Sequence, residues 1–391
     1  MRVKKGVFLL ASSLFLLTGC WDKVEINERA FVIGIGIDKF EAGPRANRES
    51  PLGEYTSAED QARNRYSVTY SFPNTGLLAG KGEGDPAFTF TAAGKNFYDI
   101  EKLIATRIKQ TLFFGHTKVM VVGEDFARDE DLMRELLDAI ERNPLLGRKV
   151  SLIITPGKAK EVLESKPPLD PRPGWYMSEL IRQKQWTSRI PDADLGYILR
   201  SLHESQSAIT PRVIATEEDI KIAGAAILKD YHLVGWLGEM EARAVMFMQD
   251  KLRTTEISPQ VGEKEIPVEL SDAHTKMRVF ERDGEMVVSF DIEAEGIIEQ
   301  HRFEVRGETF DAAYIRRVEQ TAARDIHKQI EETYEKLQKD YEVDIVQANE
   351  YLRKFEPDLW RKVKSQWSEI YPHTNLELSV KVKVRRMGVV K

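Results

Sequence analysis

The chain of 391 residues contains a single cysteine, Cys20. No disulfide can therefore form within the chain, so its fold must be held together by packing alone. The length is too great for one ordinary domain and predicts two or three. Hydrophobic residues make up 42% of the sequence, which is enough to build several packed cores. These features predict a multi-domain globular protein without covalent cross-links.

The first residues have the pattern of a secretory signal peptide. Three cations, Arg2, Lys4 and Lys5, precede an apolar run of eleven residues over 7–17. A helix of that length is too short for a hydrocarbon core of about 30 Å, which needs about 20 residues. A short positive segment followed by a short apolar one is typical of a cleaved leader. The pattern predicts that residues 1–19 are a signal peptide.

Cys20 follows this segment directly, in the sequence Leu-Thr-Gly-Cys. These four residues resemble the bacterial lipobox, which implies that Cys20 receives a diacylglyceryl thioether and becomes the new amino terminus. Two acyl chains on one residue give stable anchoring, whereas one chain binds reversibly. The alternative is an ordinary cysteine, buried or incidental. The preferred prediction is a lipoprotein, held on the outer face of a membrane through Cys20.

The charge balance makes some partners improbable. The formal net charge is −6, and removal of residues 1–19 leaves 54 basic against 63 acidic residues, a net charge of −9. Phosphate backbones demand clustered Lys and Arg, so no nucleic-acid partner is expected. The same acidity argues against a polybasic grip on anionic lipid. Membrane attachment is therefore expected to depend on the lipid.

The first half of the mature chain alternates strands and helices. Buried or half-buried strands are expected over 30–37, 66–72, 118–122 and 150–154, and helices over 95–110, 129–142 and 156–164. Residues 41–64 and 74–85 are polar and rich in turn-forming residues, as is typical of loops. This order predicts a mixed sheet flanked by helices, and we expect an N-terminal α/β domain over 20–165.

A middle region is expected next. Residues 166–174 hold four prolines, which indicates a stiff linker, and short helices are expected over 175–185 and 194–204. The polar stretch 205–218 is the main expected domain boundary. We therefore expect a Pro-rich linker and small helical region over 166–215.

The remainder, 216–391, is expected to form a C-terminal α+β domain. It begins with apolar strands over 222–229 and 233–237 and a helix over 239–248; three strands should follow between 265 and 303, with Asp283-Gly284 as a hairpin turn. A long helix is expected over about 308–341. Its apolar positions recur every 3.9 residues on average, more than the 3.6 of a straight helix, which predicts a bend or a change of packing partner. The predicted fold class is α+β and multi-domain, closed by a strand over 376–384.

Motifs for chemistry are weak. Gly34 and Gly36 lack the third glycine of a dinucleotide loop, so close strand packing is preferred, and residues 76–82 are one residue short of a phosphate loop and favour a flexible turn. The histidines lie at least 25 residues apart, without metal-ligand spacing. No nucleophile elbow or zinc-protease motif is present. We predict no cofactor, no metal site, no catalytic residues and no enzymatic activity.

Aromatic residues gather near the carboxyl end. Trp360 and Trp367 are seven residues apart, which would place them on one helix face near Phe355 and Tyr371. A core cluster is the preferred interpretation, and a surface that docks a partner is the alternative.

Several longer segments resemble one known family. They are GCWDKVEINERAFVIGIGIDK (19–39), FFGHTKVMVVGEDFAR (113–128), ESKPPLD (164–170), GAAILKDYHLVGWLGEMEAR (224–243) and PDLWRKVKSQWSEIYP (357–372). In this order the chain is similar to the Ger(x)C lipoproteins, the C subunits of spore nutrient germinant receptors. The charged loop over 41–64 departs from the family pattern.

The resemblance implies a function. Such a chain would be a non-catalytic subunit of a receptor in the inner spore membrane, with the integral A and B subunits as partners, and would take part in nutrient-triggered germination. The B subunit is similar to amino-acid transporters. Only Cys20 is carried over as a functional position. Two alternatives stay open, a lipid-anchored protein that itself binds a small nutrient and an anchored hydrolase.

Overall fold

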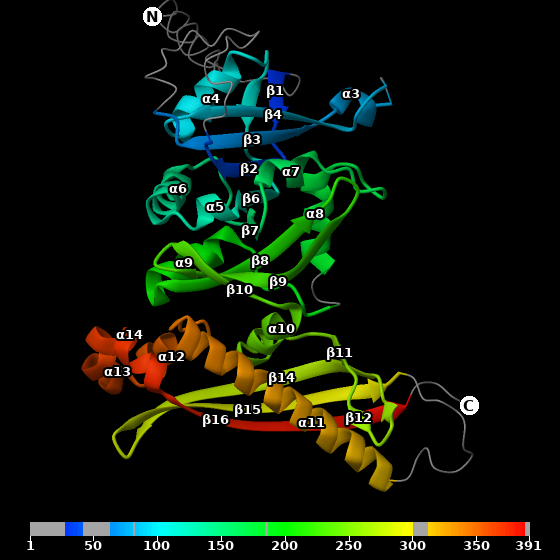
Figure 1. Ribbon diagram of the computed structural model, residues 1–391, viewed down its shortest axis with the longest axis vertical. Helices are drawn as coiled ribbons and strands as arrows, with labels where there is room; N and C mark the ends of the chain where they lie inside the picture. The colour runs from blue at the N-terminus through cyan, green and yellow to red at the C-terminus, as the bar shows by residue number, and fades with distance from the viewer. Residues whose placement is uncertain (1–27, 42–62, 81–82, 184–186, 300–311, 388–391) are drawn as a thin grey trace, which may run out of the picture.

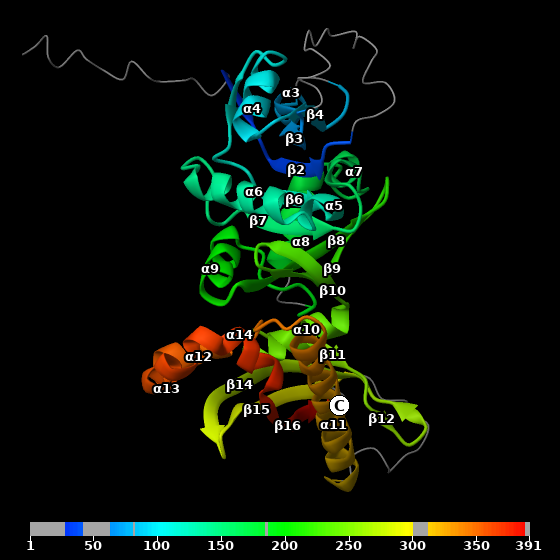
Figure 2. The same ribbon diagram turned by 60° about the vertical axis from the view of Figure 1, so that its left-hand side comes forward.

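The computed structural model describes residues 28–41, 63–80, 83–183, 187–299 and 312–387. Figures 1 and 2 show an elongated molecule with two lobes along its longest axis. The N-terminal lobe is built on an eight-stranded sheet and the C-terminal lobe on a four-stranded sheet. The predicted class, α+β with mixed sheets flanked by helices and a long C-terminal helix, is confirmed.

The eight-stranded sheet has the order β10-β9-β8-β7-β6-β2-β3-β4. Its four central strands run parallel, and the strands on either side are antiparallel. Buried on both faces, the central strands are almost continuously apolar, as expected of parallel strands. The strands are β2 (Gly34–Lys39), β3 (Tyr66–Pro73), β4 (Ala87–Gly94), β6 (Val119–Gly123), β7 (Ser151–Thr155), β8 (Ser207–Ala215), β9 (Ile220–Lys229) and β10 (His232–Leu237).

Helices cover both faces of this sheet. One face packs against α4 (Phe97–Ala105), α5 (Glu124–Ala127), α6 (Glu130–Arg142) and α9 (Leu195–Ser205), and the other against α7 (Ala159–Glu164) and α8 (Pro173–Arg182). Amphipathic spacing explains α6, whose five buried side chains lie on one face. The outer end of the lobe adds α3 (Thr75–Leu78) and a parallel pair, β1 (Arg29–Phe31) with β5 (Thr111–Phe113).

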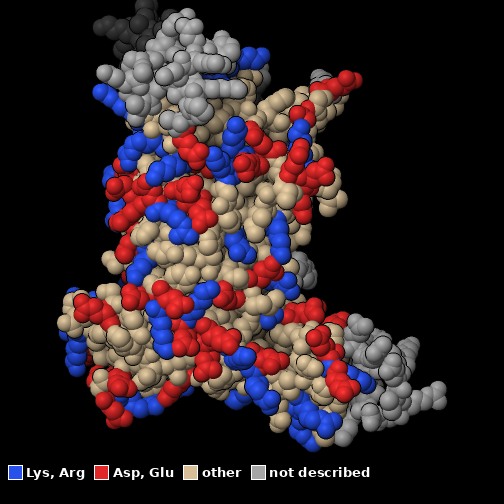
Figure 3. Space-filling model, viewed as in Figure 1, with Lys and Arg blue, Asp and Glu red and all other residues tan. Residues whose placement is uncertain are grey.

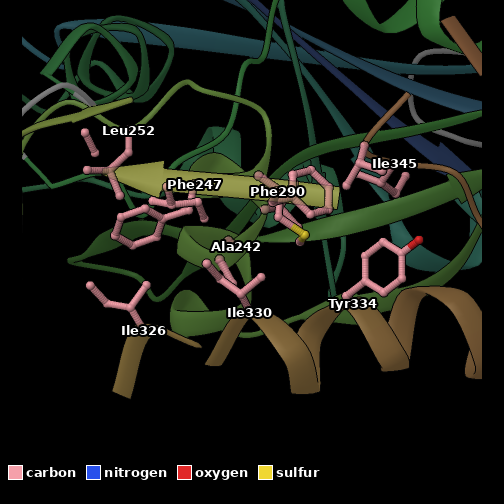
Figure 4. Packing of buried hydrophobic residues seen from close by; sticks show 14 of the residues in the cluster. Ala242, Phe247, Leu252, Phe290, Ile326, Ile330, Tyr334 and Ile345 are labelled. Carbon is pink, nitrogen blue, oxygen red and sulfur yellow. The ribbon is translucent and has the colours of Figure 1, made fainter. Parts of the chain in front are cut away.

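The C-terminal sheet has the order β11-β14-β15-β16. Figure 4 shows its core, in which Phe290 of the sheet lies among side chains of two helices, including Phe247, Ile330 and Tyr334. The strands are β11 (Thr255–Ile257), β14 (Val268–Arg282), β15 (Glu285–Ile298) and β16 (Asn375–Met387), and the helices are α10 (Glu239–Met248), α11 (Ala312–Glu335), α12 (Ala348–Phe355), α13 (Pro357–Val363) and α14 (Trp367–Ile370).

A π-helical turn follows α11 and closes the long helix. Residues 336–340 continue α11 with the i→i+5 pattern, which has more residues per turn than an α-helix. Leu337 is buried in that turn and extends the stripe formed by Ile330 and Tyr334. The predicted long helix is confirmed over the described residues 312–340, and the four-residue spacing of its buried side chains lies within α11 itself.

Two predictions about the strands need correction. In the described part of this range, which ends at 299, two long strands, β14 and β15, stand where three strands were expected between 265 and 303. The turn at Asp283 and Gly284 is confirmed, with φ of 53° and 83°. The expected polar boundary over 205–218 contains β8, which pairs with β7 and β9 inside the sheet. Apolar residues such as Ile209 and Val213 are buried there, and the hydroxyl of Thr210 donates to the carbonyl of Leu152.

The strands β9 and β10 belong to the N-terminal sheet, whereas the sequence assigned them to the C-terminal domain that begins at 216. Their apolar residues face the helices α5, α6 and α10, so they bury surface in both lobes. The pairing corrects the assignment of these two strands. The domain limits at 165 and 215 otherwise stay predictions.

Candidate functional site

Cys20 lies outside the described residues, so its predicted lipidation stays a prediction. The described chain begins at Glu28, and β1 starts at the next residue. In the part of the chain that the structure describes, no helix is long and apolar enough to cross a membrane.

The seam between the two lobes is polar where α9 meets α12. Ser205 Oγ donates to Asn349 Oδ1 at 3.0 Å, and Asn349 Nδ2 donates to the carbonyl of Glu204 at 2.9 Å. Gln347 Nε2 also donates to Ser201 Oγ at 3.0 Å. These bonds join the end of a helix in one lobe to the start of a helix in the other.

Lysines carry further contacts across the seam. Lys229 Nζ, on β9, donates to the carbonyl of Tyr341 at 3.2 Å, and Lys336 Nζ donates to the carbonyl of Trp236, on β10, at 3.4 Å. Within the C-terminal lobe, Lys336 Nζ also lies 2.7 Å from Glu241 Oε1 of α10. The seam also has an apolar part, because Ile209, Ala225 and Ile227 of the N-terminal sheet belong to one buried cluster with residues of the C-terminal lobe.

A cavity of about 490 Å³ opens at this seam. Polar and charged groups from both lobes line it, and it is the kind of convergent, inter-lobe site where small molecules bind. No sequence motif predicts this cavity, because its two sets of residues lie more than 110 positions apart. They include His203, Ser205, Lys229 and Asp230 from the N-terminal lobe and Asp344, Asn349, Lys364 and Trp367 from the C-terminal lobe.

Asp344 organises the C-terminal wall of the cavity. Its carboxylate accepts hydrogen bonds from the backbone N–H of Ala348 and Asn349, both at 2.9 Å, and from Trp367 Nε1 at 3.0 Å. Burial raises the pKa of Asp344, although these three donors act in the opposite direction. The carboxylate therefore caps α12 and fixes the indole that lines the cavity.

The predicted aromatic cluster is confirmed in part. Trp367 and Tyr371 are buried with ring centroids 5.9 Å apart, and Trp360 packs edge-on against Trp367 at 6.1 Å. A 3₁₀ turn over residues 364–366 separates the tryptophans, so they do not share one continuous helix face as expected. Phe355 is 65% exposed and contacts Tyr351 instead of the cluster.

The weak motifs have structural roles. A Cβ added to Gly34 or Gly36 would lie 2.9 or 3.0 Å from Leu163, which confirms close packing of β2 against α7. The prediction of a flexible turn over 76–82 was wrong for the first residues of that segment, because residues 75–78 form the helix α3. Among the described residues, no group of three His, Cys, Asp or Glu side chains could hold a metal ion.

Two family models match the chain. The spore germination protein N-terminal domain matches residues 22–215, and the domain described as spore germination B3/GerAC like, C-terminal, matches residues 223–388. Spore germination protein YndF of Bacillus subtilis (strain 168) is 25% identical over 405 residues, covering 100% of this chain and 98% of that protein. Spore germination protein B3 of the same organism is 23% identical, with 100% of both chains covered.

A solved structure has the same fold. The crystal structure of the GerBC protein matches with a TM-score of 0.60 at 20% identity, covering 86% of this chain and 95% of that one. The resemblance inferred from the sequence segments is confirmed, since the two family models together span nearly all of residues 22–388. The chain therefore belongs to the Ger(x)C family of spore germination proteins.

Proposed function

We propose that this chain is a lipid-anchored, non-catalytic subunit of a spore germinant receptor, which takes part in nutrient-triggered germination. The observation that carries the proposal is similarity over the full chain to proteins named as spore germination proteins. The segment that ends at Cys20 supports attachment to a membrane, because a cleaved leader followed by a diacylated cysteine leaves a stable anchor.

In this proposal the A and B subunits are the partners, and the location is the outer face of the inner spore membrane. The lobes then form a scaffold beside the integral subunits, with the amino terminus fixed in the bilayer. Affinity purification of the tagged chain from detergent-solubilised spore membranes should recover both subunits. Recovery of neither subunit, with the chain intact, would contradict this part of the proposal.

The anchor is tested by Cys20→Ala. The variant should leave the membrane fraction, and mass spectrometry of the unaltered protein should find a diacylglyceryl group on Cys20. Thr18→Ala is a matched control, because it keeps a small residue before the cysteine and should not change fractionation. Full membrane retention of Cys20→Ala, with Cys20 unmodified in the natural chain, would refute the proposal.

The inter-lobe cavity favours one second candidate, direct binding of a small nutrient. Its volume of about 490 Å³ and its polar walls from two lobes suit a small polar solute. Calorimetry with amino acids and sugars separates the candidates. The accessory-subunit proposal predicts no saturable heat from the isolated chain. A saturable heat that Lys229→Met abolishes and the exposed control Lys276→Met preserves would favour nutrient binding.

A further inference from the structure

We propose that a cleft at the outer end of the N-terminal lobe binds the headgroups of anionic phospholipids and holds that end of the protein on the membrane surface. The inference rests on the lipid anchor of the proposed function and adds a second, protein-borne contact to it. The cleft has a volume of about 370 Å³ and lies between the β1–β5 pair and the edge strand β4.

The cleft combines rings with cations. Phe31, Phe72, Phe88 and Phe90 line it together with Arg29, Arg107 and Lys109, and no carboxylate is among the described residues of its wall. Phe88 is 47% exposed although it is large and apolar. Aromatic side chains beside basic ones are typical of surfaces that meet the membrane interface, where rings sit at headgroup level and cations meet phosphate.

The three cations are available to an anion. Arg29 Cζ lies 4.5 Å from the ring centroid of Phe113, and Arg107 Cζ lies 5.7 Å from that of Phe90 and donates to the carbonyl of Thr91 at 2.6 Å. Within the described residues, none of the three forms an ion pair with a carboxylate. Figure 3 shows acidic and basic side chains intermixed over the face of both lobes that it presents. Although the chain as a whole is acidic, the cleft is therefore a local basic site.

The position of the cleft fits this occupant. Arg29 lines the cleft and follows Cys20 by nine residues, which span at most about 30 Å when fully extended. An acylated Cys20 therefore keeps the cleft within about 30 Å of the bilayer. Figures 1 and 2 place β1, β4, α3 and α4 at the end of the molecule farthest from the C-terminal lobe.

Exposed apolar residues extend the same end. Leu78 on α3 is 53% exposed and Tyr98 on α4 is 68% exposed, and Lys102 Nζ lies 5.1 Å from the centroid of the Tyr98 ring. Scattered exposed apolar residues are ordinary on a protein surface. These two are relevant because they lie on the elements that the anchor holds near the bilayer.

The single cysteine permits a clean test on the full acylated chain. With Cys20 blocked by lipid, Phe88→Cys provides one free thiol for a fluorophore, and Leu78→Cys provides an independent site that leaves the cleft intact. The chain is reconstituted into vesicles of phosphatidylcholine, with or without 30% phosphatidylglycerol, and quenching by spin-labelled lipid is measured. Labels at 88 and 78 should be quenched at least threefold more than a label at Glu281→Cys in the C-terminal lobe, and only when phosphatidylglycerol is present.

The charge requirement has a matched control. Arg29→Gln with Lys109→Gln should reduce quenching to the phosphatidylcholine level, whereas Lys276→Gln with Lys362→Gln should not. Equal quenching in both lipid compositions, or no more quenching at 88 and 78 than at 281, would overturn the inference while an acylated Cys20 keeps the anchor intact. Mass spectrometry that finds Cys20 unmodified would overturn the proposed function and this inference with it.

Discussion

Asp344 shows how much of the seam depends on one carboxylate. Replacing it by alanine leaves two backbone N–H groups and the Trp367 indole N–H without their acceptor in a buried site. Each unsatisfied buried donor costs about 1–3 kcal/mol. We expect Asp344→Ala to lower the free energy of unfolding by several times the effect of Trp367→Phe, which removes one of the three bonds. Urea unfolding of both variants measures this, and equal effects would contradict it.

A second carboxylate, Glu350 on α12, makes stability depend on pH. It accepts hydrogen bonds from Arg353 at 2.6 and 2.7 Å and lies 3.2 Å from Lys354 Nζ. The bonds to Arg353 are the main cause that lowers the pKa of Glu350 below 4.5, while burial raises it. Because the pKa is lower in the folded chain, this stabilisation is present above pH 4.5 and is lost as the pH falls through the lower folded value.

The pH prediction is checked with Glu350→Gln. The stability difference between this variant and the unaltered chain should be largest near pH 7 and should shrink as the pH is lowered from 5 to 3. The exposed Glu356→Gln is the control and should show little difference at any pH. A stability difference that stays constant between pH 7 and pH 3 would mean that Glu350 stabilises the fold without its charge.

At the scale of elements, the contact between β2 and α7 predicts an order among glycine variants. A Cβ on Gly36 would lie 3.2 Å from the backbone oxygen of Ala159, so the helix itself must move, whereas a Cβ on Gly34 meets the flexible end of Leu163. Gly36→Ala should therefore destabilise the chain more than Gly34→Ala, by about 1–3 kcal/mol. Gly147, with nothing within 4 Å of an added Cβ, is the control. Thermal unfolding measures both variants, and a lower melting temperature for Gly34→Ala than for Gly36→Ala would contradict the prediction.

Patterns among residues close in the sequence predicted the amphipathic helices well. The placement of strands in the sheets depends on pairing between segments, which such patterns do not show. The spacing of apolar residues located α6 and the long helix, because one periodic face is enough to identify an amphipathic helix. It missed β8, which pairs along its length with β9, the next strand of the chain, and joins the rest of the sheet through β7, more than 50 residues earlier. The cavity at the seam was missed for the same reason, whereas the lipidation of Cys20, which stays a prediction, depends on a local motif.

At the scale of the whole molecule, Gly235 on β10 sets how closely the lobes approach. An added Cβ would overlap the ring of Tyr341, at the end of the π-helical turn. Gly235→Ala should force the lobes apart and destabilise the chain by about 1–3 kcal/mol, and Tyr341→Ala in the same chain should relieve part of that loss. A double-mutant cycle measures the coupling, and strictly additive effects would show that the two residues do not meet.

The shared sheet has a consequence for chimeras between relatives of this family. A junction at 215 would pair β8 of one parent with β9 and β10 of the other, so the buried side chains of one sheet would come from both parents. A junction at Gly238, between β10 and α10, keeps every strand of that sheet with its own parent. Residues that do not fit one another would then meet only at the lobe seam. There Gly235, Lys229 and Ser205 come from one parent and their contact partners from the other, so the two parents must be alike at these positions.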